Sequence, residues 1–266
     1  MPQQSLKISI VTASFDQGPY IACAIESVLS QNYDNFEHII IDNCSTDETV
    51  AVLKRYPHLK VVCEKDQGQS DALNKGFKMA TGDIVGWLNA DDKYLPGCFK
   101  GVIEVFAKNP KIDLFYGDYR FVDAQGDLIR VRKELGFDAF MLKYLHVLYI
   151  PTTTSFFRKK IFDEGNFLNV NYHYAMDYEF FLRLAQRGYK FGHIAQVMAD
   201  FRWHDDNKSS TQTVLQKEEM EKALLVHDKL LNGLQGPARY LLRNFFMLMA
   251  RGKRTLLKFL YGAYAH

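Results

Sequence analysis

Two adjacent carboxylates end an apolar run in the stretch GWLNADD, residues 86–92. Asp91 and Asp92 are separated from the apolar segment by Asn89 and Ala90 alone. Like charges at close range raise the free energy needed to ionise each of them. We therefore expect a positive charge beside this pair, or free access to water.

The motifs of several nucleotide-binding enzyme classes are missing. No GxxxxGK[ST] loop is present, and the first turn, TASFDQGPY, lacks both the GxGxxG fingerprint and the Arg-containing glycine-rich loop of sugar nucleotidyltransferases. A haloacid-dehalogenase-like phosphatase would need aspartates where residues 12–14 read TAS. Mg²⁺ or Mn²⁺ commonly bridges protein carboxylates to substrate phosphates. The expected counter-charge of Asp91 is therefore a metal-bound diphosphate.

Strand and helix patterns alternate through the first half of the chain. Strands are expected over residues 7–13, 36–43, 60–65, 83–89 and 112–118, and helices over 19–31, 47–56, 69–80 and 97–109. Ser45 and Glu48 have the spacing of a capping box that opens the second helix. Such alternation predicts parallel strands with crossover helices in a Rossmann-like sheet, which binds ligands beyond the carboxyl ends of its strands. One rim should then carry Ala13 to Phe15, Asp42, Asp66 and Asp91.

The second half has a different pattern. Residues 119–132 predict a hairpin that turns at Gln125-Gly126. Helices are expected over 156–167 and 175–188, and short strands over 190–194 and 197–204. Gly188 should close the second of these helices. After the polar stretch DDNKSS, residues 211–266 predict further helices.

The composition is that of a globular protein. The 266 residues are 47% hydrophobic, and a net charge of +2 gives no indication of nucleic-acid binding. Four cysteines without metal-ligand spacing indicate free thiols in a reducing compartment. The start has no signal-peptide core, and the apolar runs are shorter than the ~20 residues of a membrane span. We expect a cytoplasmic protein, with association to the inner face of a membrane left open.

Six motifs together resemble a known family. SIVTASFDQGPYIACAIESVLSQNY, EHIIIDNCSTDET, EKDQGQSDALNKG and GDIVGWLNADDKYLPG are similar to the nucleotide-binding half of glycosyltransferase family 2, and YAMDYEFFLRLA and FRWH to its acceptor half. The resemblance covers about residues 6–210. It implies an α/β protein of the GT-A fold, with a Rossmann-like mixed sheet flanked by helices. The expected units are a catalytic domain over 1–210, with halves 1–95 and 96–210, and a C-terminal helical extension over 211–266.

The resemblance implies a nucleotide-sugar donor, most often UDP-linked. Asp42 would bind the base and Phe15 would lie against it, although Asp42 could instead cap a helix and Phe15 could belong to the core. Asp66 would lie near the ribose or uracil and Asp71 near the donor sugar or diphosphate. The full expected donor-binding set is Ala13, Phe15, Asp42, Asp66, Asp71, Asn74, Asn89 and Ala90.

The resemblance also implies a Mn²⁺ or Mg²⁺ cofactor. Asp91 matches the metal-binding carboxylate of the family's D-x-D-like motif, with Asn89 where many members carry the first Asp. His204 matches a late histidine near the metal or diphosphate. The alternatives are a turn role for Asp91 and a structural role for His204. Asp92 would support the metal ligands or point to solvent.

Asp177 matches the family's catalytic base, with Met176 in place of the usual preceding acid. Its alternative role is to cap the helix that follows. The implied reaction is an inverting single displacement, in which an Asp of ordinary pKa, ~4, accepts the proton of an acceptor hydroxyl. Ala199 stands where processive synthases carry the Gln of QxxRW, so we expect one sugar per encounter. A non-catalytic nucleotide-sugar-binding module is the alternative function.

The acceptor is expected to be a glycan or a lipid-linked glycan of polysaccharide biosynthesis. Residues 237–266 contain six basic and no acidic residues, interleaved with Leu, Phe and Met. This segment predicts either a peripheral membrane contact or helices that pack on the catalytic domain. The sequence does not identify the sugar, the acceptor, the linkage or the oligomeric state.

Overall fold

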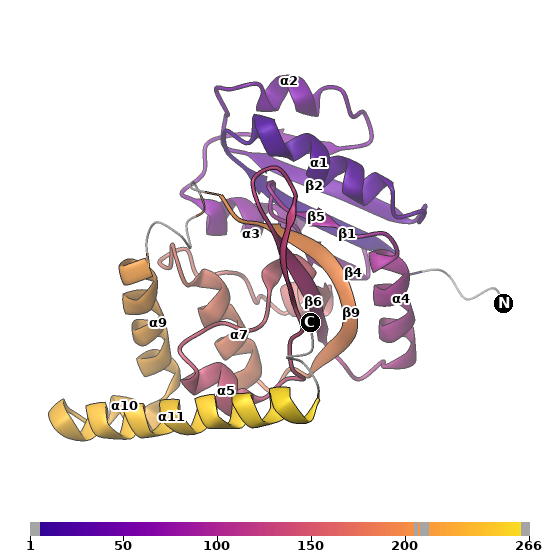
Figure 1. Cartoon of the computed structure of the whole chain (residues 1–266). Coiled ribbons are helices and arrows are strands. Elements are labelled where there is room, and N and C mark those ends of the chain that lie inside the picture. Colours follow the sequence, from indigo (N-terminus) through magenta and orange to yellow (C-terminus); the bar gives the residue numbers. More distant parts are fainter. Residues whose placement is uncertain (1–5, 205–206, 208–212, 262–266) are drawn as a thin grey trace.

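The computed structural model describes residues 6–204, 207 and 213–261. Its central feature is a nine-stranded mixed sheet with the order β3-β2-β1-β4-β8-β6-β9-β5, in which β7 pairs with β6. Helices flank the sheet, and α11 crosses one end of the molecule while α1 and α2 lie at the other (Figure 1).

The first four strands are parallel, as the sequence predicts. They are β1 (Ile8–Ser14), β2 (Phe36–Asp42), β3 (Lys60–Cys63) and β4 (Ile84–Trp87). Successive side chains of a strand point to opposite faces. Ile8 and Ile10 accordingly pack in one core cluster, and Val11 packs in another on the opposite face.

Helices between and after these strands cover both faces. They are α1 (Gly18–Leu29), α2 (Thr49–Leu53), α3 (Gln69–Met79) and α4 (Cys98–Lys108). The predicted capping box of α2 is wrong, because Glu48 is the N-cap without a side-chain cap and the Ser45 hydroxyl donates to Asp42. The Ser45 hydroxyl oxygen accepts the N–H of Asp16 at 2.9 Å, rather than an N–H group of the helix.

The predicted fifth strand is β6 (Leu114–Val122), which does not lie next to β4. The antiparallel strand β8 (Phe156–Arg158) lies between them, and it begins a segment predicted to be a helix. Phe156 and Phe157 are both buried, which suits a central strand covered on two faces. Only α6 (Lys160–Asp163) is helical in this segment.

The remaining sheet is built around β6. It pairs with β7 (Leu128–Arg132) in the predicted hairpin and with β9 (Phe191–Arg202), which also pairs with β5 (Lys93–Tyr94). The prediction of two short strands over 190–204 is wrong. A single strand continues through a register shift opposite Gly117–Tyr119, where Ala195, Gln196 and Met198 have no partner in the register and form a bulge or irregularity.

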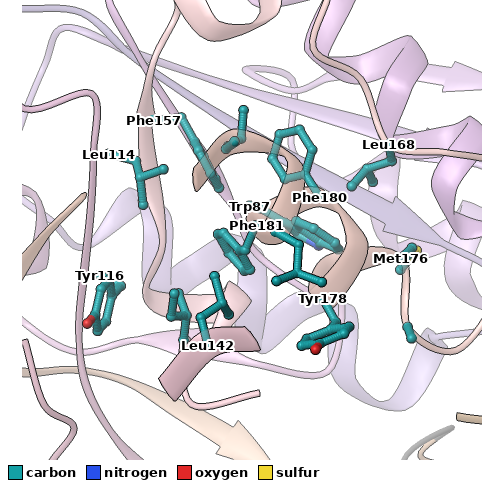
Figure 2. Packing of buried hydrophobic residues seen from close by; sticks show 14 of the residues in the cluster. Trp87, Leu114, Tyr116, Leu142, Phe157, Leu168, Met176, Tyr178, Phe180 and Phe181 are labelled. Carbon is teal, nitrogen blue, oxygen red and sulfur yellow. The ribbon is translucent and has the colours of Figure 1, made fainter. Parts of the chain in front are cut away.

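Helices of the second half pack on the sheet and on each other. They are α5 (Ala139–Tyr144), the 3₁₀ turn η1 (Thr152–Thr154) and α7 (Met176–Gln186), followed by α9 (Thr213–His227), α10 (Lys229–Asn232) and α11 (Gly236–Leu260). Gly188, at φ +86°, follows α7 as predicted. In the core under α7, Trp87, Phe157, Phe180 and Phe181 lie close together (Figure 2). This core supports the first residues of α7.

The C-terminal helices pack against the body of the protein. α9 lies along α7, and α11 lies along α5 (Figure 1). Within the described part of the chain, no helix combines the length and the apolar character that a bilayer crossing requires.

Candidate functional site

A cavity of about 430 Å³ opens at the carboxyl ends of β1 and β4. Its walls come from loops after the strands, from the first turns of α3 and α7, and from α9. Most of the predicted site residues border it: Ala13, Phe15, Asp66, Asn89, Ala90, Asp91, Asp177 and His204. The structure thus brings the two ends of the proposed chemistry, Asp91 and Asp177, to one cavity.

Three predicted donor-binding residues do not border this cavity. Asp42 is buried, and its carboxylate accepts hydrogen bonds from the backbone N–H and the hydroxyl of Ser45. Asp71 accepts the N–H of Gln67 at 3.1 Å. Asn74 exchanges two hydrogen bonds with the backbone of Leu168, at 2.8 and 2.9 Å. In the structure these side chains hold the loops that shape the cavity.

One end of the cavity combines an exposed aromatic ring with carboxylate and amide groups. Phe15 is 52% exposed, and the Lys65 ammonium lies 5.9 Å from its ring centroid. Asp66 accepts the N–H of Gly68 at 2.8 Å, and its own N–H donates to the Asn43 side chain at 3.0 Å. Gly68, at the start of α3, has a backbone φ of +113°. Residues other than glycine rarely adopt this value.

Asp91 and His204 meet at the cavity wall. The Asp91 Oδ2 atom lies 3.0 Å from His204 Nε2 and accepts a hydrogen bond from Asn207 Nδ2 at 3.2 Å. The His204 ring stacks on Tyr20, with 4.9 Å between ring centroids. These contacts hold the two candidate ligands next to each other.

The sequence left open whether Asp92 supports the metal ligands or points to solvent. The structure excludes the second possibility. Asp92 is buried and accepts hydrogen bonds from the Arg202 N–H, the Asn89 amide and the Thr153 hydroxyl. Burial, and then the charge of Asp91, raise the pKa of Asp92 well above its ordinary value. Asp92 therefore resists ionisation, and the repulsion between the two neighbouring carboxyl groups is reduced.

Asp91 and His204 fit part of a divalent-cation site. A carboxylate oxygen is a ligand that Mg²⁺ and Mn²⁺ both prefer, and an imidazole nitrogen is a common metal ligand. Over residues 6–204, 207 and 213–261, no group of three or more His, Cys, Asp or Glu side chains could hold a metal ion. A bound ion would thus need further oxygen ligands, which the phosphates of a donor and water would supply.

Asp177 lies in the first turn of α7. The alternative that it caps this helix is wrong, because the N-cap is Ala175 and has no side-chain cap hydrogen bond. Burial raises the pKa of Asp177 to about 6, against the lowering effect of the Tyr178 N–H, which donates to it at 2.7 Å. The nearby Glu219 charge raises this pKa further. The expectation of an ordinary pKa is therefore wrong, and Asp177 is a stronger base than an exposed aspartate.

Sequence reasoning missed the part of the site that α9 supplies. The Glu219 carboxylate accepts the backbone N–H groups of His173, Tyr174 and Ala175 at 2.7 to 2.9 Å. Gln216 borders the cavity and donates to the Tyr174 carbonyl at 3.2 Å. These residues belong to a segment predicted as an extension, and no local motif marks them.

The family assignment comes from the comparisons with known proteins. Residues 9–165 match the family model described as glycosyl transferase family 2. The chain is 26% identical to WfaP of Escherichia coli, a UDP-Glc:alpha-D-GlcNAc-diphosphoundecaprenol beta-1,3-glucosyltransferase, over 77% of this chain and 80% of that protein. It is 25% identical to a chondroitin synthase of Escherichia coli over 79% of this chain, but spans only 31% of the synthase.

Solved structures show the same fold. TarS of S. aureus in complex with UDP-GlcNAc superposes with a TM-score of 0.69 and 17% identity, over 91% of this chain and 70% of that one. The mannosyltransferase PcManGT from Pyrobaculum calidifontis, solved with GDP-Man and Mn²⁺, gives a TM-score of 0.61 and 17% identity over 99% and 87%. The predicted GT-A fold is thus confirmed, and with a family model that matches more than half of its residues the chain belongs to glycosyl transferase family 2.

Proposed function

We propose that the protein transfers a sugar from a nucleotide-diphosphate sugar to a hydroxyl group of a glycan or lipid-linked glycan, with inversion at the anomeric carbon.

 The donor is UDP-linked, and the pathway is polysaccharide biosynthesis. The observation that carries this proposal is the shared cavity, which Asp91 and His204 border together with Asp177. The printed activity of WfaP, a UDP-glucose-dependent transferase with a diphosphoundecaprenol-linked acceptor, supports the donor and acceptor classes.

The donor would bind between the exposed aromatic end of the cavity and the Asp91–His204 pair. The Phe15 ring offers an apolar face to a nucleobase, and its 52% exposure leaves room for a stacked ring. Asp66 lies close by and would accept hydrogen bonds from the ribose or base. The buried Asp42 would act indirectly, because it holds the Ser45 loop in place.

Asp91 and His204 would hold a Mn²⁺ or Mg²⁺ ion. When bound, such an ion neutralises the charge that develops on the departing diphosphate, which is worth several kcal/mol. The protein's own part is to keep Asp91 in position. The Arg202 guanidinium does this by donating to the Asp91 carbonyl at 2.9 Å, while Asn207 donates to the Asp91 side chain.

Asp177 would act as the general base. The acceptor hydroxyl attacks the anomeric carbon from the face opposite the diphosphate, and Asp177 takes the hydroxyl proton as the new C–O bond forms. The bond between the anomeric carbon and the diphosphate oxygen breaks, and the nucleoside diphosphate leaves with its electron pair. A positioned base of this kind typically contributes about 10²–10⁴ in rate.

A non-catalytic nucleotide-sugar-binding module is the second candidate. Asn89 favours it, because this side chain is engaged by Trp87 and Asp92 and offers no carboxylate to a metal. The raised pKa of Asp177 at the cavity favours an enzyme, since a binding module has no use for a strong base there.

The decisive test replaces Asp177 by Asn, which keeps the size of the side chain and removes the base. We expect a loss of turnover of at least about 10²-fold with UDP binding unchanged by calorimetry. The matched control is Asp163→Asn, an exposed carboxylate of α6 outside the cavity. Full activity of Asp177→Asn would remove this residue from the reaction, and no donor turnover by the unmodified protein with a panel of acceptors would favour the binding module.

A further inference from the structure

The inner face of α11 is anchored to the protein. Phe246 packs against the rings of Phe140 and Tyr144, with centroid distances of 5.9 and 4.7 Å, and Ala250 is fully buried. Arg243 pairs with Glu221 at 2.7 Å. This side of the helix therefore behaves as an ordinary part of the fold.

The outer face of α11 is apolar. We call it the outer stripe, and its members are Leu241, Phe245, Leu248, Leu256 and Phe259, which are 55–78% exposed. Their spacing of three, four or eight residues places them on one side of the helix, over about 27 Å at 1.5 Å per residue. A surface helix normally turns its polar side to water. The outer stripe therefore indicates a surface that covers it.

A basic pocket borders the outer stripe. It has a volume of about 310 Å³, and four cationic side chains line it: Arg132, Arg251, Arg254 and Lys258. Arg251 follows Leu248 of the outer stripe by three residues, so both lie on adjoining sides of the helix. Val147, which is exposed, also lines the pocket.

The basic pocket contains more positive than negative charge. Among the described residues, Glu134 pairs with Arg132, Arg254 and Lys258 at 3.3 to 3.7 Å, and no ion pair is found for Arg251. Lys258 is almost fully buried, and its Nζ also donates to the Lys133 carbonyl. Burial lowers the pKa of Lys258, and the charges of Arg254 and Arg132 lower it further against the effect of Glu134. A bound anion would relieve this repulsion.

The positive charge of α11 favours an anionic membrane over a second copy of the chain as the partner of the outer stripe. Residues 237–266 contain no acidic side chain, so two copies joined through this face would bring like charges together across a two-fold axis. An anionic membrane surface offers the complementary combination, with acyl chains for the stripe and phosphate groups for the pocket.

We propose that the outer stripe of α11 lies in the interface of an anionic membrane, with the phosphate of a lipid headgroup in the basic pocket formed by Arg132, Arg251, Arg254 and Lys258. This contact does not depend on the sugar-transfer proposal. It would hold the protein at the membrane through the end of the molecule opposite α1 and α2 (Figure 1).

The test is co-sedimentation of the full chain with vesicles of phosphatidylcholine alone or of phosphatidylcholine mixed with about 30 mol% of the anionic lipid phosphatidylglycerol. We expect pelleting with the anionic vesicles only. The double variant Leu248→Glu/Phe259→Glu should lower the partition coefficient at least about tenfold. Its matched control is Val214→Glu/Val226→Glu, which changes two exposed apolar residues of α9.

The basic pocket is tested separately by Arg251→Glu, with Lys100→Glu on the surface of α4 as the control of equal charge change. We expect Arg251→Glu to weaken vesicle binding several-fold more than Lys100→Glu. Circular dichroism and UDP calorimetry verify that each variant is folded and binds nucleotide. Equal pelleting of the stripe variant and its control, equal effects of the two charge variants, or a dimer that the stripe variant dissociates would overturn the proposal.

Discussion

At the scale of single residues, neighbouring carboxyl groups have different tasks because their surroundings differ. Asp91 reaches the cavity, whereas Asp92 is buried and joins the Arg202 N–H, Asn89 and Thr153. The sequence predicted that Asp91 matters, but it could not decide where Asp92 points, because two of its partners, Thr153 and Arg202, come from positions far along the chain.

The raised pKa of Asp177 predicts a pH dependence of the proposed activity. Because only the ionised carboxylate can accept a proton, kcat/KM should fall about tenfold per pH unit as the pH drops below about 6. Assays between pH 4.5 and 8.5 with saturating donor measure this fall on the acidic side of the pH profile. UDP binding is measured at the same pH values. A constant kcat/KM down to pH 4.5 would contradict the role of Asp177 as a base.

The same pKa makes Asp177 a source of instability above its titration range. Its folded pKa lies above its unfolded value of 3.8, so its contribution to stability is fully present below that value and is lost as the pH rises through about 6. Asp177→Asn should therefore raise the free energy of unfolding at pH 8 by about 1–2 kcal/mol, after allowance for its partial exposure. Urea unfolding at pH 8 and pH 4 checks this, and an equal gain at both values would refute the explanation.

Glu219 should act as a positioning residue for Asp177. Its carboxylate holds three backbone N–H groups before α7, and its charge raises the pKa of Asp177. We expect Glu219→Gln to move the acidic limb of the pH profile to lower pH and to reduce kcat more than it changes the KM for the donor. Glu218→Gln, an exposed neighbour on α9, is the control. An unshifted pH profile would leave Glu219 with a structural role only.

At the scale of elements, the sequence predicted the regular parts of the fold. The first four strands alternate with helices, and their apolar runs identify them. The strand β8 was missed because a short apolar run such as Phe156–Phe157 suits a strand and a helix equally. The continuity of β9 and the contribution of α9 to the cavity depend on pairing between distant segments, which no local pattern reveals.

Arg202 joins several of these elements and provides a test of their connection. At the end of β9, its guanidinium donates to the carbonyl groups of Asp91, Asp123 and Ala124. Arg202→Lys should cost about 2 kcal/mol of unfolding free energy, because a single ammonium cannot reproduce this fork of donors. It should also weaken metal-dependent UDP binding. Thermal unfolding and calorimetry measure both effects, and a variant with unchanged values would show that these contacts are dispensable.

At the scale of the whole molecule, the C-terminal helices form two functional parts. α9 carries Gln216 to the cavity and Glu219 to the backbone before α7, whereas α11 presents the outer stripe at one end of the molecule. The predicted boundary at residue 210 describes a change in sequence pattern, and the contacts between α7 and α9 cross it.

Two truncations separate these parts. A chain that ends at residue 210 loses the buried Met220, Ala223 and Leu224 together with the Glu219 contacts. Burial of one large apolar side chain contributes about 1.5–3 kcal/mol, and a whole domain is stable by only about 5–15 kcal/mol, so this truncation should abolish cooperative unfolding. A chain that ends at residue 235 keeps α9 and exposes Phe140 and Tyr144 of α5, so it should fold with a lower Tm and retain UDP binding. A cooperative transition of the 210-residue chain near the Tm of the full chain would show that α9 does not belong to the catalytic unit.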